Sequence, residues 1–214
     1  MSKPITYVLA VTDRSGSMYS LVDDVRGGFN THLADLKKAS AEKGLEFRMS
    51  VTIFDTEFTK LAVAAKLEDV PELTTKNYFA RGGTALLDAV GRTVTDFEAT
   101  VKLRKKDKVI LFIQTDGAEN SSREFSWEGI KNMLEEKEKT GQWSINYVGQ
   151  GVDSWDQADR FGSGTHAIYA AASAGDTQSS YRGRTMSTIA YAAGASPAEA
   201  SQFLDNEIKK GLQN

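Results

Sequence analysis

Residues 5–17 of the chain read ITYVLAVTDRSGS, an apolar run that ends in one carboxylate and two hydroxyl side chains. Such an apolar run is typical of a strand buried in a parallel sheet, and a helical pattern follows it directly. Asp13, Ser15 and Ser17 therefore lie two positions apart at the carboxyl end of a predicted strand. Their hard oxygen atoms suit a divalent cation such as magnesium better than they suit a phosphate group.

The rest of the chain alternates short apolar runs with longer helical patterns, which is typical of a parallel sheet covered on both faces. Further strands are predicted at 47–53, 58–64, 109–113, 145–148 and 167–171, and helices from about Ser17, at 86–97, 126–139 and 155–161, and twice within 176–211. The turn at residues 55–57 is too short for a parallel crossover, so the two strands that it joins form an antiparallel hairpin. The predicted fold is α/β: a doubly wound, mainly parallel, Rossmann-like sheet with one antiparallel edge strand and helices on both faces.

The first predicted helix has one apolar face and one interruption. Its apolar residues recur at spacings of three and four: Val22, Val25, Phe29, Leu33 and Leu36. Gly27 and Gly28 interrupt this pattern, at a cost of about 1 kcal/mol each relative to alanine. We expect the helix to approach the sheet closely at these glycines in compensation.

The domain organisation is predicted from length and composition. The chain has 214 residues and three prolines, and no stretch of it has the composition of a linker. Residues 1–175 are interpreted as one domain, and residues 176–214 as a helical extension packed on it. Ser196, Pro197 and Glu199 are expected to form the capped start of the last helix.

The composition argues against several classes of function. The net charge is −3, so the large basic surface of a nucleic-acid-binding protein is absent, and the basic run at 102–108 is interpreted as a solvated helix end. The chain has no cysteine, which excludes disulfides and thiolate metal sites and fits a reducing compartment. The apolar run near the N-terminus is too short to span a membrane and lacks a signal-peptide pattern. We therefore expect a soluble, cytoplasmic protein with no membrane or nucleic-acid partner.

Three segments are expected to meet at the carboxyl edge of the predicted sheet, where open parallel sheets bind their ligands. They are residues 13–17, the loop 82–84, and residues 115–117 after the apolar strand 109–113. If the strands before the first and the third segment are neighbours, five oxygen-bearing side chains converge: Asp13, Ser15, Ser17, Thr84 and Asp116.

The order and spacing of these residues resemble the metal-ion-dependent adhesion site (MIDAS) of von Willebrand factor A (VWA) domains. The resemblance covers roughly residues 4–175 and includes all the positions of that motif, together with the apolar strands before Asp13 and Asp116. The segments DRSGSM, RGGTALLDA and TDGAEN are similar to those of small stand-alone VWA proteins of bacteria and their phages.

The resemblance implies a metal site and a way of using it. Ser15, Ser17 and Thr84 would bind magnesium directly or through a water molecule, with manganese or calcium as alternatives. Asp13 and Asp116 would supply the charge, and two carboxylates leave the ion incompletely coordinated. An aspartate or glutamate of a protein partner, or of another copy of the chain, would complete the coordination. The resemblance thus implies a metal-dependent protein-interaction module rather than an enzyme.

Residues on the same loops are expected to surround the ion: Arg81, Gly83, Gly117, Glu119 and Asn120. Glu119 and Asn120 are expected to shape the partner surface or to hold water molecules around the ion. For Arg81, attraction of an incoming carboxylate and pairing with a local acid both stay open. Asp55 is better explained by the hairpin turn than by the site.

Other interpretations remain open on the residues alone. The metal site could mainly stabilise the fold of an assembly subunit, and residues 13–17 by themselves could be a helix N-cap. Asp13 could also be the nucleophile of a magnesium-dependent phosphotransferase. Ser15 argues against this, because a hydroxyl cannot exchange protons near neutral pH as the second carboxylate of such enzymes does. His32 and His166 lie far from the ligand segments, so structural or surface roles are favoured for both.

Overall fold

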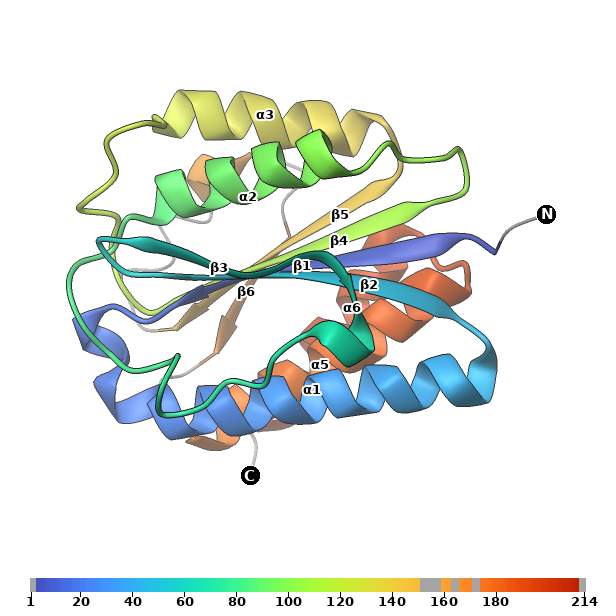
Figure 1. The fold of residues 1–214 in the computed structure, drawn as a ribbon, viewed down its shortest axis with the longest axis horizontal. Helices are drawn as coiled ribbons and strands as arrows, with labels where there is room; N and C mark the ends of the chain where they lie inside the picture. The colour runs from blue at the N-terminus through green and yellow to red at the C-terminus, as the bar shows by residue number, and fades with distance from the viewer. Residues whose placement is uncertain (1–2, 151–158, 163–165, 171–173, 212–214) are drawn as a thin grey trace.

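The computed structural model describes residues 3–150, 159–162, 166–170 and 174–211 (Figure 1). Within these ranges the strands of one sheet are β1 (Ile5–Asp13), β2 (Glu46–Phe54), β3 (Phe58–Lys66), β4 (Lys108–Thr115), β5 (Trp143–Gln150) and β6 (His166–Ala170). The α-helices are α1 (Val22–Lys43), α2 (Leu86–Thr100), α3 (Trp127–Lys139), α5 (Ala174–Ala193) and α6 (Pro197–Gly211). Short 3-10 segments are η1 (Gly16–Leu21), η2 (Leu67–Asp69) and η3 (Asp159–Phe161).

The strand order is β3-β2-β1-β4-β5-β6, and every neighbouring pair except β2 and β3 is parallel. The antiparallel pair is the predicted hairpin, which is confirmed. β2 lies on one side of β1 and β4 on the other, so the winding of the chain reverses between β1 and β4. Open α/β sheets bind ligands at such a switch point. The predicted doubly wound, mainly parallel sheet with one antiparallel edge strand is therefore confirmed.

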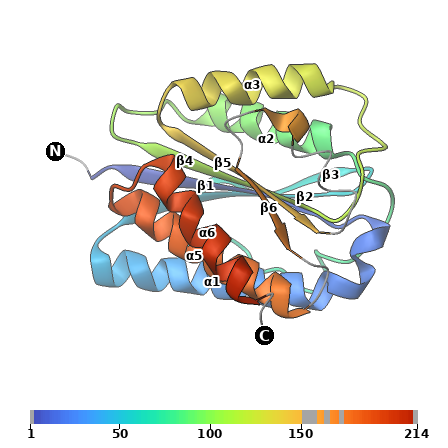
Figure 2. The ribbon, with the colours of Figure 1, turned by 180° about the vertical axis from the view of Figure 1, so that it is seen from behind.

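Helices cover both faces of the sheet. α2 and α3 lie on one face, and α1, α5 and α6 lie on the other, as the view from behind also shows (Figures 1 and 2). Each face buries its own apolar core, because successive side chains of a strand point to opposite faces. On β1, Val8 and Ala10 belong to the core beside α1, whereas Leu9 and Val11 belong to the core beside α2. Burial on both faces explains the nearly continuous apolar sequence of the central strands.

The first helix begins later than predicted. Residues 16–21 form the 3-10 segment η1, and α1 starts at Val22 rather than near Ser17. The amide of Gly16 donates to the carbonyl of Gly82 at 3.1 Å, so a contact with a distant loop shapes this segment. The predicted apolar face of α1 is confirmed by its buried residues: Val25, Phe29, Leu33 and Leu36.

The two glycines of α1 differ in their surroundings. A Cβ atom built on Gly28 would lie 2.2 Å from the ring of Tyr181 in α5, whereas one built on Gly27 would meet nothing within 4 Å. Gly28 alone therefore makes a close approach. The approach is to α5 and not to the sheet as we expected, because α1 and α5 lie side by side on the same face (Figure 2).

The C-terminal helices belong to the same layer as α1. α5 packs against α1, and α6 packs against α5. Tyr181 and Leu204 are buried in the core on that face. The predicted cap of α6 is confirmed, because the amide and the hydroxyl of Ser196 both lie 2.8 Å from Glu199 Oε2. The division of the chain at residue 175 stays a prediction.

Two predicted elements fall partly outside the described residues. Of the predicted helix at 155–161, residues 155–158 lie outside them and residues 159–161 form η3. The predicted last strand is present as β6, with residue 171 outside. Among the helices of the described ranges, none has the length and apolar character needed to cross a membrane.

Candidate metal centre

The residues predicted to bind metal lie at the switch point of the sheet. Asp13 is the last residue of β1, and Asp116 directly follows β4. The two strands pair in parallel, so their carboxyl ends meet at the same edge. Ser15 directly precedes η1, Ser17 is the second residue of η1, and Thr84 lies two residues before α2.

Four of these residues are linked by hydrogen bonds. Ser17 Oγ donates to Asp116 Oδ1 at 2.6 Å, and Ser15 Oγ lies 3.1 Å from Ser17 Oγ. Asp13 Oδ1 accepts a hydrogen bond from the Ser15 amide at 2.6 Å. The structure thus brings together residues from the ends of two strands that are distant in the sequence.

Thr84 and the two serines face a common space beside Gly117. A Cβ atom built on Gly117 would lie 3.1 Å from Thr84 Oγ1, 3.3 Å from Ser17 Oγ and 3.8 Å from Ser15 Oγ. Three hydroxyl oxygens from two loops therefore surround a point that glycine leaves free. Any side chain at this position would occupy the space in front of the hydroxyl groups.

Gly82 and Gly83 allow the loop before Thr84 to follow its path. Gly82 has a φ of +67°, in the left-handed region that favours glycine. A Cβ atom built on Gly83 would lie 2.5 Å from Ser121 Oγ and 2.8 Å from Asn120 Oδ1. Gly82 is thus a turn residue, and Gly83 permits close contact with the loop that follows β4.

Burial opposes the ionisation of both carboxyl groups. Asp13 is fully buried, and this burial raises its pKa to about 7, although hydrogen bonds from Thr115 and Ser15 act in the opposite direction. Burial also raises the pKa of the partly exposed Asp116, against the hydrogen bond from Ser17. A neighbouring positive charge favours the ionised form of a carboxyl group. The electrostatics of the cluster therefore suit a cation.

Two residues that contact Asp13 were not found by sequence analysis. Thr115 Oγ1 donates to Asp13 Oδ2 at 2.5 Å, and the Tyr78 hydroxyl donates to the Asp13 carbonyl at 2.5 Å. Thr115 has a recognisable position, because it is a hydroxyl residue at the end of an apolar strand, next to Asp116. No sequence pattern marks Tyr78, because it comes from an irregular loop 65 positions away from Asp13.

Arg81 pairs with local acids. Its Nε donates to Asp55 Oδ2 at 2.8 Å, and its Nη2 forms an ion pair with Glu57. Two roles were left open for Arg81, attraction of an incoming carboxylate and pairing with a local acid, and the structure shows the pairing. Asp55 closes the hairpin turn by accepting from the Glu57 amide at 2.6 Å. Burial would raise the pKa of Asp55, but hydrogen bonds from Arg81, the Glu57 amide and Arg14 hold it below its ordinary value.

Asn120 and Glu119 bind backbone groups of neighbouring segments. Asn120 Oδ1 accepts from the Thr84 amide at 2.9 Å, and the Asn120 amide donates to the Thr84 carbonyl at 3.0 Å. Glu119 accepts from the amides of Leu87 and Ser121 at 3.0 and 2.8 Å. Asn120 thus holds a predicted ligand residue, and Glu119 ties its loop to the start of α2. Their expected roles toward a partner or water stay predictions.

The donor set is rich in hydroxyl groups. In the part of the chain that the structure describes, no three or more His, Cys, Asp or Glu side chains gather in a group that could hold a metal ion. The cluster instead offers two carboxylates, Asp13 and Asp116, and three hydroxyls, Ser15, Ser17 and Thr84. These are hard oxygen donors of the type that magnesium, manganese and calcium bind. The residues present therefore fit a divalent cation of this kind.

Known proteins resemble the chain in fold and not in sequence. No protein-family model matches it. No curated protein sequence matches it. Among solved structures, the PilB minor pilin of Streptococcus sanguinis has a TM-score of 0.60 at 13% identity, over 88% of this chain and 62% of the pilin. A von Willebrand factor type A protein of Catenulispora acidiphila has a TM-score of 0.53 at 15% identity, over 88% of this chain and 43% of that one. The manganese-loaded TRAP protein of Plasmodium vivax has a TM-score of 0.54 at 19% identity, over 79% of this chain and 68% of the TRAP chain.

The fold is that of a VWA domain. At these identities the similarity establishes the fold alone, and the chain spans less than two thirds of the pilin and less than half of the Catenulispora protein. Within the VWA fold, the switch point between β1 and β4 is where the described structure gathers Asp13, Ser15, Ser17, Thr84 and Asp116.

Proposed function

We propose that the chain is a protein-interaction module that uses a divalent cation, magnesium by preference, to bind a carboxylate of its partner. The residues that would hold the cation are Asp13, Ser15, Ser17, Thr84 and Asp116. The observation that carries the proposal is the convergence of three hydroxyl oxygens on the space beside Gly117. When bound, the cation would supply an electrophilic centre for an incoming aspartate or glutamate.

The exposure of the cluster supports contact with a second protein. Ser17 is exposed and Asp116 is partly exposed, whereas Asp13, Ser15 and Thr84 are buried. One side of the cluster is therefore anchored in the sheet edge, and the other is accessible from outside. Further support comes from the VWA fold shared with a protein that was solved with manganese.

Calorimetry with magnesium or manganese chloride tests the metal site. We expect the parent protein to bind one equivalent of either ion, and an Asp13→Ala, Asp116→Ala double variant to lose this binding while staying folded. Ion binding should also stabilise the parent protein, by about 2.7 kcal/mol when the free ion is at 100 times its dissociation constant. A folded double variant that binds the ion as tightly as the parent contradicts the proposal.

Co-purification from the native host tests the partner. A protein that is retained with magnesium, released by a chelator and retained again when magnesium is restored supports a bridging ion. Sedimentation velocity of the pure chain under the same conditions tests self-association. A retained protein whose binding ignores the chelator contradicts metal-dependent recognition.

Stabilisation of the fold by the cation is the second candidate, and the complete burial of Asp13 favours it. A buried carboxylate is costly unless it is paired, so an adjacent cation would stabilise the folded chain. The two candidates differ in one measurement. If chelation lowers the melting temperature and leaves every interaction of the protein intact, the stabilising role is correct.

A further inference from the structure

Asp55 joins the two loops that carry the hydroxyl groups of the candidate metal centre. It directly follows β2 and is buried, with 1% of its surface exposed. Its Oδ2 atom accepts from Arg14 Nε and from Arg81 Nε, both at 2.8 Å. Arg14 lies between Asp13 and Ser15, and Arg81 lies three residues before Thr84. One carboxylate oxygen therefore holds both loops.

Backbone hydrogen bonds continue this connection. The Arg81 amide donates to the Arg14 carbonyl at 2.9 Å, and the amide of Ala85, next to Thr84, donates to the Asp55 carbonyl at 2.9 Å. The backbone amide of Arg14 donates to the Phe54 carbonyl at 2.8 Å. Hydrogen bonds thus join the two loops to each other and to the end of β2.

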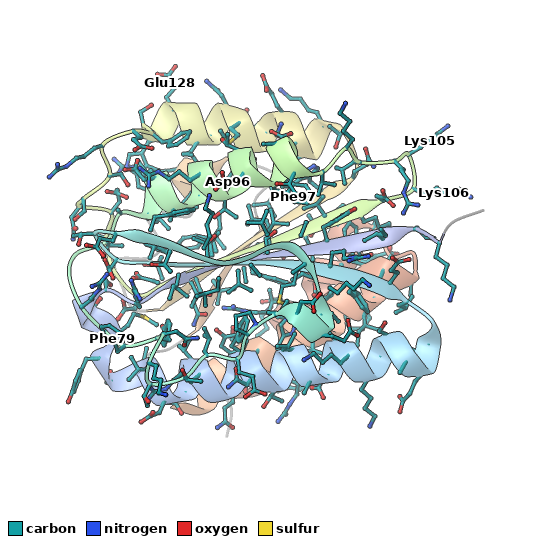
Figure 3. The ribbon with its side chains drawn as sticks, in the orientation of Figure 1. Phe79, Asp96, Phe97, Lys105, Lys106 and Glu128 are labelled. Carbon is teal, nitrogen blue, oxygen red and sulfur yellow. The ribbon has the colours of Figure 1, made fainter. Side chains whose placement is uncertain are left out.

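The remaining contacts of the Arg14 side chain are with residues outside the candidate metal centre. Its Nη1 donates to the Asn77 carbonyl at 3.2 Å and its Nη2 to Thr59 Oγ1 at 3.3 Å. Arg14 and Arg81 also lie against the ring of Phe79, with guanidinium carbons 5.5 and 5.7 Å from its centre. Figure 3 places Phe79 at the end of the molecule where β1 and β4 finish.

We propose that Asp55 is a positioning residue of the metal centre. Through Arg14 and Arg81 it holds the loops of Ser15, Ser17 and Thr84 in place before an ion binds, so that binding does not have to order them. Residues that orient metal ligands typically change metal affinity by roughly 10- to 100-fold when they are mutated. The inference rests on the proposed metal site and names a residue outside its donor set.

A matched pair of variants tests the proposal. Asp107 is a second buried aspartate with 1% exposure; it binds Arg104 Nε at 2.8 Å and the Ile5 amide at 2.9 Å. It precedes β4, at the opposite end of the sheet, beside the labelled Lys105 and Lys106 (Figure 3). We expect Asp55→Asn and Asp107→Asn both to lower the melting temperature in chelator. Only Asp55→Asn should raise the dissociation constant for manganese, by roughly 10- to 100-fold.

A second matched pair of variants distinguishes a positioning role of Asp55 from a purely electrostatic one. Both substitutions are at partly exposed arginines, so neither changes a buried side chain. Arg81 and Arg92 each have 40% exposed side chains and each pair with an acid, Arg92 with Glu124. Arg81→Ala removes a positive charge, so a purely electrostatic role of Asp55 predicts tighter manganese binding, whereas a positioning role predicts weaker binding. We expect about tenfold weaker binding for Arg81→Ala and a change within twofold for Arg92→Ala.

The outcomes distinguish the two levels of the proposal. If the parent protein binds neither manganese nor magnesium, the metal centre is wrong and the role of Asp55 falls with it. If the parent binds the ion and both Asp55→Asn and Arg81→Ala bind it equally well, only the positioning role is overturned. Tighter binding by Arg81→Ala also overturns it.

Discussion

Ser17 Oγ donates a hydrogen bond to Asp116 Oδ1 at 2.6 Å, although the two residues are 99 positions apart in the chain. The contact joins the segment after β1 to the residue after β4, across the switch point of the sheet. A hydroxyl group that donates one hydrogen bond keeps lone pairs that can face a cation. The same contact that orients Ser17 therefore leaves its oxygen able to act as a metal ligand.

Gly117→Ala is expected to weaken cation binding without removing any ligand. The added methyl group would lie 3.1 Å from Thr84 Oγ1 and 3.3 Å from Ser17 Oγ, in the space that the hydroxyl groups surround. Gly117 is not among the glycines with a left-handed φ, so alanine can adopt its backbone conformation. We expect a rise of at least about tenfold in the manganese dissociation constant, equivalent to about 1.4 kcal/mol, measured by calorimetry. An unchanged constant in a folded variant contradicts the proposed position of the ion.

Thr115→Val is expected to destabilise the protein in the presence of a chelator. The substitution keeps the shape of the side chain and removes the hydroxyl that donates to buried Asp13 Oδ2 at 2.5 Å. Loss of a hydrogen bond to a buried charged group costs about 1–3 kcal/mol, which urea unfolding at pH 8 would measure. Thr93→Val is the control, because the buried Thr93 hydroxyl bonds to two neutral groups, Thr52 Oγ1 and the Ala89 carbonyl. A smaller loss for Thr115→Val than for Thr93→Val would argue against this account.

Alanine substitutions of the two glycines in α1 are expected to have opposite effects. Gly27 is exposed and a Cβ there meets nothing within 4 Å, so Gly27→Ala should raise the free energy of unfolding by about 0.5–1 kcal/mol. Gly28→Ala should lower it, because the new Cβ would lie 2.2 Å from the Tyr181 ring and force α1 and α5 apart. Thermal or urea unfolding of both variants measures the difference. Stabilisation by both substitutions would show that α1 and α5 pack less closely than described.

Acid conditions are expected to destabilise the protein through His32. This residue of α1 is buried, and its Nδ1 lies 2.8 Å from Thr185 Oγ1 of α5. Burial, and then the positive charge of Arg184, lower the pKa of His32 to about 3. The unfolded chain takes up the proton near pH 6.5 and the folded chain does not, so stability is retained above pH 6.5 and lost as the pH falls toward 3. We expect His32 to contribute a loss of about 2 kcal/mol between pH 7 and pH 5.

His32→Asn isolates this contribution. Asparagine keeps a donor for Thr185 and does not titrate in this range. Urea unfolding of both proteins at pH 7 and pH 5 should show a smaller loss for the variant, because the other titrating groups are common to both. Equal losses would mean that His32 becomes protonated in the folded protein.

The sequence was informative where local patterns carry the structure. The apolar runs predicted the strands, and the short turn at 55–57 predicted the antiparallel pair. The start of α1 was predicted wrongly, because a tertiary contact between Gly16 and Gly82 shapes η1 and no local pattern reports it. The partner of Gly28 was also predicted wrongly, since helical periodicity shows which face is buried and not which element covers it.

By itself the sequence determined the class of fold and the choice of candidate ligands, because strand ends and oxygen-bearing side chains are both visible in a linear chain. Only the tertiary structure decided how the candidate site is held. Asp55, Arg14 and Arg81 come from different loops, and their pairing depends on where those loops meet. The contact of Tyr78 with Asp13 likewise depends on the loop of Tyr78 lying next to the end of β1. Periodicity encodes which residues lie on one element, whereas contacts between loops appear only when the sheet brings the ends of its strands together.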